Sequence, residues 1–104
     1  MSENELALTT QLIVKDFSLE DTDLPEGTSQ IDELKAALKK IVSYLLDKDM
    51  SRLLMALYRI DVSETKVKQV LAVAEPEKIA DSITDLIIAR ELQKVETRIK
   101  YSGQ

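Results

Sequence analysis

The sequence contains no cysteine and no histidine. Without cysteine the chain has no disulfide and no thiolate nucleophile. Without histidine it lacks the side chain that most often acts as an acid or base near neutral pH. Zinc sites built on sulfur or imidazole are excluded for the same reason. We therefore expect no catalytic residues, no metal site and no cofactor, and we do not expect an enzyme.

Aromatic side chains are also scarce, with one phenylalanine, three tyrosines and no tryptophan among 104 residues. Leu, Ile, Val and Ala carry most of the 44% hydrophobic content, so the core has few large anchors. A domain of this size buries only about 60 to 70% of the surface of its unfolded chain. We expect one domain and a self-associating surface that adds to its burial.

Long apolar runs are missing as well, and the first residues, with Glu3 and Glu5, are acidic rather than basic. These features predict neither a signal peptide nor a membrane span, so the expected location is the cytoplasm. The net charge of −5 is uneven: residues 1–28 hold seven acids and Lys15 alone, a charge of −6, and residues 29–104 carry +1. This distribution favours self-masking or a protein partner and disfavours nucleic acid.

The two glycines and two prolines lie at expected element boundaries, which leaves the interior open to helices. Apolar spacing predicts helices over 29–46, with Thr28 or Ser29 as its cap, and over 50–59. A third follows Ser63 as its cap, and a fourth begins at Pro76 and runs to about Tyr101. We predict an all-α fold: a small four-helix array over 29–104 with a long C-terminal helix.

Residues 1–28 are predicted as an acidic, extended N-terminal arm, because Leu6, Leu8, Leu12 and Val14 alternate with polar residues. Residues 5–12 could also form one or two helical turns. A strand here would need a second strand, most simply the same segment of another chain.

The last helix changes its apolar face midway. Its first half places Ile79, Ile83 and Ile87 on one side, whereas a second set falls nearly opposite. We name this second set the C-terminal stripe: Ile88, Leu92, Val95 and Ile99. Since a helix of about 25 residues is about 38 Å long, one half can seal the core while the other contacts a second body. We expect a partner chain on the stripe; the alternative is cover by the N-terminal arm of the same chain.

Arg90, Lys94 and Arg98 form a basic line at i, i+4 and i+8 on the same helix. The simplest interpretation is a solvated face with Glu91 and Glu96 alongside. The more specific hypothesis is an anionic partner, in which acids between Asp16 and Glu26, in the same or a neighbouring chain, lie along this line.

Residues 62–71 resemble the second half of a helix-turn-helix, with Ser63 as the cap and Thr65, Lys66 and Gln69 toward the bases. That motif usually has a small residue and a glycine where this chain has Leu57 and Asp61. A DNA-binding regulator is therefore the alternative function, although the charge of the chain disfavours nucleic acid as a partner.

Two smaller features have simpler interpretations. Asp81 and Asp85 lie one turn apart, as paired carboxylates do, but nothing else in the sequence supports a site, so we interpret them as surface charge. Tyr58 and Arg59 beside Asp61 are interpreted as a local salt bridge at a turn.

The stretches LYRIDVSE at 57–64 and DLIIARELQK at 85–94 resemble a group of short bacterial helical proteins. The resemblance covers about residues 30–101 and implies an all-helical fold and a bacterial, cytoplasmic setting. It implies no activity and no catalytic residues. Together these observations predict a protein-interaction or adaptor protein, a homodimer or a binder of another protein, acting through the C-terminal stripe.

Overall fold

The computed structural model describes residues 3–17 and 31–102, and every element in these ranges is a helix. In chain order they are α1 (Glu3–Phe17), α2 (Ile31–Lys48), α3 (Met50–Ile60), α4 (Glu64–Val73) and α5 (Pro76–Ser102). The predicted all-α class is confirmed. The described part contains five helices, one more than the predicted array.

The additional helix is α1, so the expectation of an extended arm is wrong for residues 3–17. The buried positions Leu6, Thr9, Ile13 and Phe17 follow helical spacing. The hydroxyl groups of Thr9 and Thr10 donate to the carbonyl oxygens of Glu5 and Leu6, at 2.7 and 2.9 Å. Thr9 can therefore be buried without losing its hydrogen bond. The rest of the predicted arm, residues 18–28, lies outside the described residues.

α2 and α3 form where the apolar spacing predicts them. α2 buries Leu34, Leu38, Val42 and Leu45 on one face. Asp49 separates the two helices and caps α3, because its Oδ1 accepts a hydrogen bond from the Arg52 backbone N–H at 3.2 Å. The proposed caps of α2, Thr28 and Ser29, lie outside the described residues.

The turn between α3 and α4 depends on one residue in a left-handed conformation, Asp61, with φ 68° and ψ 45°. Its N–H donates to the Tyr58 carbonyl at 3.1 Å, and the N–H of Val62 donates to the Leu57 carbonyl at 3.1 Å. This is the hydrogen-bond pattern of a Schellman C-cap. Ser63 then caps α4 by accepting from the Lys66 N–H at 3.4 Å, as predicted.

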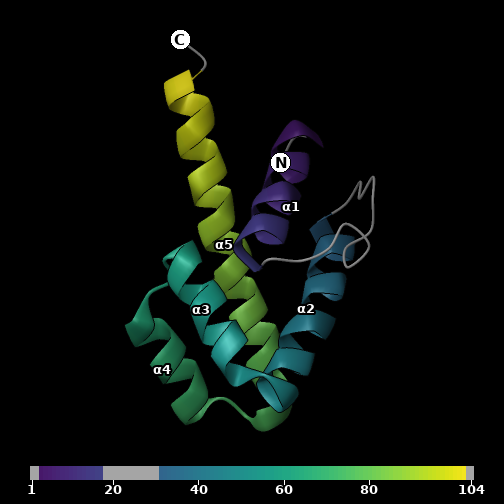
Figure 1. The fold of residues 1–104 in the computed structure, drawn as a ribbon, viewed down its shortest axis with the longest axis vertical. Helices are drawn as coiled ribbons and strands as arrows, with labels where there is room; N and C mark the ends of the chain where they lie inside the picture. The colour runs from purple at the N-terminus through teal and green to yellow at the C-terminus, as the bar shows by residue number, and fades with distance from the viewer. Residues whose placement is uncertain (1–2, 18–30, 103–104) are drawn as a thin grey trace.

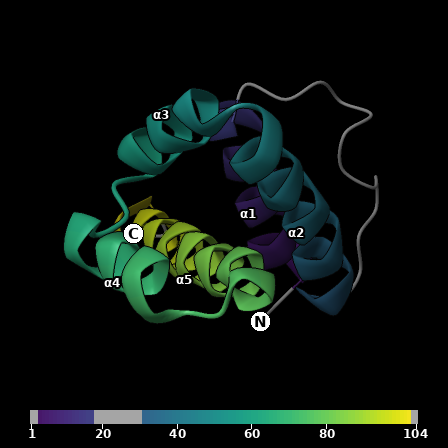
Figure 2. The same ribbon diagram turned by 90° about the horizontal axis from the view of Figure 1, so that it is seen from below.

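α5 is the common packing partner of the other helices. At 27 residues it is about 40 Å long. α2 lies beside its N-terminal half and α1 beside its C-terminal half (Figure 1). α4 packs on α5 on the side away from α2 (Figure 2). None of the helices in the described ranges is both long and apolar enough to cross a bilayer.

Candidate interaction surfaces

The C-terminal stripe is largely covered within the chain, which corrects the expectation that it faces a partner. Ile88 and Val95 are buried, Leu92 is half-buried, and Ile99 alone is more than a third exposed, at 37%. The helix that packs against this part of α5 is α1. The alternative prediction was that the N-terminal segment of the same chain covers the stripe, and this is what the structure shows for α1.

The basic line is not simply a solvated face, because Arg90 and Lys94 have acidic partners. Arg90 reaches back to the α3–α4 turn, where its Nη2 lies 3.3 Å from Asp61 Oδ2 and its Nε donates to the Asp61 carbonyl at 3.2 Å. Lys94 Nζ lies 3.1 Å from Asp16 Oδ2 on α1. Asp16 belongs to the acidic segment that the hypothesis placed along this line, and it comes from the same chain. Asp61 therefore forms an ion pair with Arg90 of α5, a contact that the sequence did not reveal.

Asp16, Lys94 and Glu91 form a cluster of two acids and one base between α1 and α5. Lys94 Nζ also lies 3.1 Å from Glu91 Oε1. The Glu91 side chain is completely excluded from solvent, and those of Asp16 and Lys94 are 12% and 22% exposed. The other oxygen of Glu91, Oε2, is buried and accepts no hydrogen bond. Glu91 was interpreted from sequence as part of a wet face, so the structure corrects that interpretation.

The surroundings of Glu91 favour its protonated form. The pKa of Glu91 is raised from 4.5 to about 7. Burial is the main cause, a hydrogen bond with Asp16 and the negative charge of Asp16 also raise the pKa, and Lys94 lowers it. Protonation also gives the carboxyl a donor toward Asp16, which resolves the unpartnered oxygen. Glu91 thus titrates near neutral pH at a helix–helix contact.

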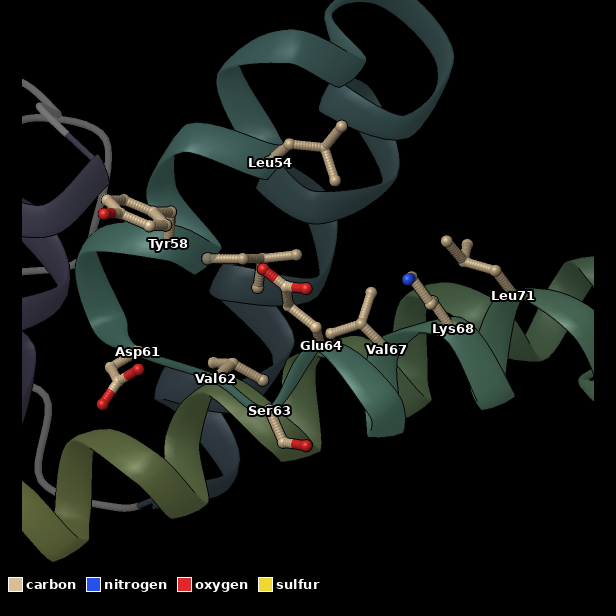
Figure 3. A pocket seen from close by; sticks show the side chains of 10 residues that line it. Leu54, Tyr58, Asp61, Val62, Ser63, Glu64, Val67, Lys68 and Leu71 are labelled. Atoms are coloured by element: carbon tan, nitrogen blue, oxygen red, sulfur yellow. The ribbon is translucent and has the colours of Figure 1, made fainter.

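A second feature is an apolar groove between α3 and α4, which we call the α3–α4 groove (Figure 3). Its volume is about 630 Å³. Leu54 and Tyr58 project from α3, and Val67 and Leu71 project from α4. The full lining is Leu54, Leu57, Tyr58, Asp61, Val62, Ser63, Glu64, Val67, Lys68 and Leu71.

The groove is open because few side chains of α4 are buried in the core. Val67 is its buried residue, and the remainder of the helix stands away from α3. As a result Leu54, Tyr58 and Leu71 are 48%, 83% and 38% exposed. Among the described residues, five of the eight large exposed apolar side chains lie on these two helices: Leu54, Met55, Tyr58, Leu71 and Val73.

Sequence reasoning missed this groove because apolar spacing predicted the two helices without showing that Leu54 and Leu71 are exposed. A signal was present: Leu53, Leu54, Met55, Leu57 and Tyr58 are too many apolar residues in close succession for one helix face. Some of them must point away from the core.

The remaining polar candidates do not assemble a chemical site. Asp81 and Asp85 pair with Lys39 and Lys35 of α2, as surface charges do. Within residues 3–17 and 31–102, no group of three or more acidic side chains could hold a metal ion.

No family model, curated protein or solved structure matches this chain. The resemblance to short bacterial helical proteins therefore stays a prediction.

Proposed function

We propose that this chain is a protein-interaction domain that works as a homodimer, with the α3–α4 groove as its contact surface. The observation that carries the proposal is the concentration of exposed apolar side chains along the two walls of the groove. Monomeric proteins rarely leave contiguous apolar patches in water, and such patches mark interaction sites. The sequence also predicted a homodimer, but with the C-terminal stripe as its contact surface; we now propose the groove instead.

The charges at the groove favour a second copy of the chain as its occupant. Glu64 and Lys68 both line the groove, one turn apart on α4. If two α4 helices meet antiparallel about a two-fold axis, each Glu64 lies opposite Lys68 of the other copy. The apolar side chains of Leu54, Tyr58 and Leu71 then lie beside these pairs in the same interface. The groove face is therefore complementary to itself in both charge and apolar character.

The size of the surface bears on the extent of the dimer contact. A stable interface uses about 20 to 30 residues and buries about 800 Å² on each partner. Ten residues line the groove, so a stable dimer must also bury neighbouring surface on α3 and α4, where Met55 and Val73 are exposed.

Sedimentation velocity of three purified proteins tests the proposal. We expect the wild type to sediment as a dimer and Leu54→Asp to sediment as a monomer, because a buried, unpaired carboxylate is strongly unfavourable in an apolar contact. Tyr44→Asp is the matched control, since Tyr44 is an exposed apolar residue of α2, outside the groove. It should leave the dimer intact. Circular dichroism establishes that each variant is folded.

Two outcomes would contradict the proposal. A wild type that stays monomeric up to its solubility limit has no dimer to explain. A dimer that survives both substitutions at the groove, Leu54→Asp and Leu71→Asp, uses another surface.

The second candidate function, DNA binding, has two observations in its favour. Asp61 adopts the left-handed conformation that glycine adopts in a helix-turn-helix, and Thr65, Lys66 and Gln69 are exposed on α4. The charge does not support it, because acids and bases balance over residues 49–75. These are Asp49, Asp61, Glu64 and Glu75 against Arg52, Arg59, Lys66 and Lys68. A DNA-binding face needs a clear excess of basic residues, so the homodimer is the stronger candidate.

A further inference from the structure

α1 covers the C-terminal stripe, and the cluster of Asp16, Lys94 and Glu91 lies in this contact between α1 and α5. Asp16 belongs to α1, and the other two residues belong to α5. The ionisation of this cluster therefore acts directly on the contact between the two helices. This contact is separate from the α3–α4 groove.

We infer that α1 is a pH-sensitive cover of the C-terminal stripe, held firmly while Glu91 carries a proton and loosened when Glu91 ionises. The geometry supplies the reason. With both acids ionised, two negative charges face the single ammonium group of Lys94, and Glu91 is completely shielded from water. A buried charge without full compensation destabilises the contact that buries it.

The hydrogen bonds point the same way. An ionised Glu91 leaves Oε2 buried without a donor, whereas a protonated Glu91 donates to Asp16. Buried polar groups that lack a partner are costly. The charged group that α3 brings to this end of α1 is Arg52, whose Nη2 donates to the Phe17 carbonyl at 3.2 Å. Asp16 from α1, Lys94 from α5 and Arg52 from α3 are thus charged groups of the described residues at this contact.

The direction and size of the effect follow from proton linkage. The docked pKa of Glu91 is about 7, against an ordinary value of 4.5 once α1 leaves. The docked state binds the extra proton, so docking is strongest below pH 4.5 and weakens as the pH rises to about 7. The full difference corresponds to about a 300-fold change in the docking equilibrium, of which about 30-fold falls between pH 5.5 and pH 8.

The apolar contacts of α1 oppose complete release. Leu6, Ile13 and Phe17 are buried in the docked helix, and since these side chains do not ionise, their burial favours docking at any pH. Ionisation of Glu91 therefore raises the population of an open state rather than detaching α1 entirely. In the open state Ile88, Leu92 and Val95 become accessible, while the contacts among α2, α3 and α5 remain.

Amide hydrogen exchange at pH 5.5 and pH 8 tests the inference. After correction for the intrinsic exchange rates, protection of α1 amides in the wild type should fall by about 30-fold at pH 8 relative to α2 amides of the same molecule. Glu91→Gln keeps the shape of a protonated glutamate and should abolish the fall. Glu96→Gln changes an exposed carboxyl on the same helix and should retain it.

The inference is overturned if α1 protection does not depend on pH, or if it falls equally in Glu91→Gln. It is also overturned if α2 loses protection in step with α1, because the whole domain then opens. Should Glu91→Gln fail to fold, Asp16→Asn replaces it: removing the neighbouring negative charge should shrink the fall, and an unchanged fall would contradict the inference. Repeating the exchange in Leu54→Asp separates this result from that of the proposed dimer.

Discussion

At the scale of single residues, Asp61 and Glu91 have roles that their positions in the sequence do not reveal. Asp61 was interpreted as part of a local salt bridge at a turn, and in the structure it adopts a left-handed backbone conformation and pairs with Arg90 of α5. Glu91 was interpreted as one charge on a wet helix face, and it is fully buried. In both cases the partner is distant in sequence: Arg90 for Asp61, and Asp16 for Glu91.

The left-handed conformation of Asp61 leads to a prediction about two substitutions at this position. Asp61→Gly and Asp61→Ala both remove the carboxylate that pairs with Arg90, but only alanine keeps a Cβ in the left-handed region. We expect Asp61→Ala to have a free energy of unfolding about 1 kcal/mol lower than that of Asp61→Gly, measured by urea denaturation. Ala89→Gly, at an exposed position in the right-handed interior of α5, should instead lower stability by about 1 kcal/mol. Equal stability of the two Asp61 variants would refute the argument.

At the scale of elements, the helices divide into those that local signals define and the one that packing defines. The predicted bounds of the four helices after residue 28 lie within two residues of α2, α3 and α5 and match the start of α4. Caps at Asp49 and Ser63 and the proline at 76 are local signals, which explains the agreement. α1 has an ambiguous pattern, in which Leu6, Leu8, Leu12 and Val14 fit a strand as well as a helix. Its contacts with α3 and α5 decide between the two.

Because α1 belongs to the core, removing one of its buried side chains should destabilise the whole domain. Ile13→Ala should lower the free energy of unfolding by about 2 to 4 kcal/mol, since it leaves a cavity at a fully buried site. Gln11→Ala, on the exposed face of the same helix, should change stability by less than about 0.5 kcal/mol. Chemical denaturation followed by circular dichroism measures both values. If the two variants prove equally stable, α1 is an appendage rather than part of the core.

At the scale of the whole molecule, the balance of charge separates the two candidate functions. The chain has a net charge of −5, and its acids and bases are paired or mixed on the faces that the structure describes. A surface of this kind favours association with protein over association with the phosphate backbone.

We therefore expect no retardation of a random-sequence DNA duplex in a gel-shift assay at physiological salt, at protein concentrations up to about 10 μM. Non-specific binding by DNA-binding proteins typically has a dissociation constant of about 10⁻⁴ to 10⁻⁶ M under such conditions, so this assay detects the tighter part of that range. Selection from a pool of random duplexes is the more sensitive form of the experiment. Retardation that disappears in the variant Lys66→Ala/Gln69→Ala would favour the helix-turn-helix alternative.

The sequence by itself determined the helical class, the positions of α2 to α5 and the exclusion of thiol and imidazole chemistry. Each of these depends on residue identity or on spacing within one helix, so no knowledge of distant contacts is needed. It also identified the two apolar faces of α5 and the acidic segment that supplies Asp16.

Only the tertiary structure decided which neighbour covers each face. α1 lies on the C-terminal stripe, Asp16 brings a second carboxyl to Glu91, and α4 stands away from α3 to leave Leu54, Tyr58 and Leu71 exposed. Burial is a property of the whole packing arrangement: an apolar or acidic side chain looks the same in the sequence whether water or another helix covers it.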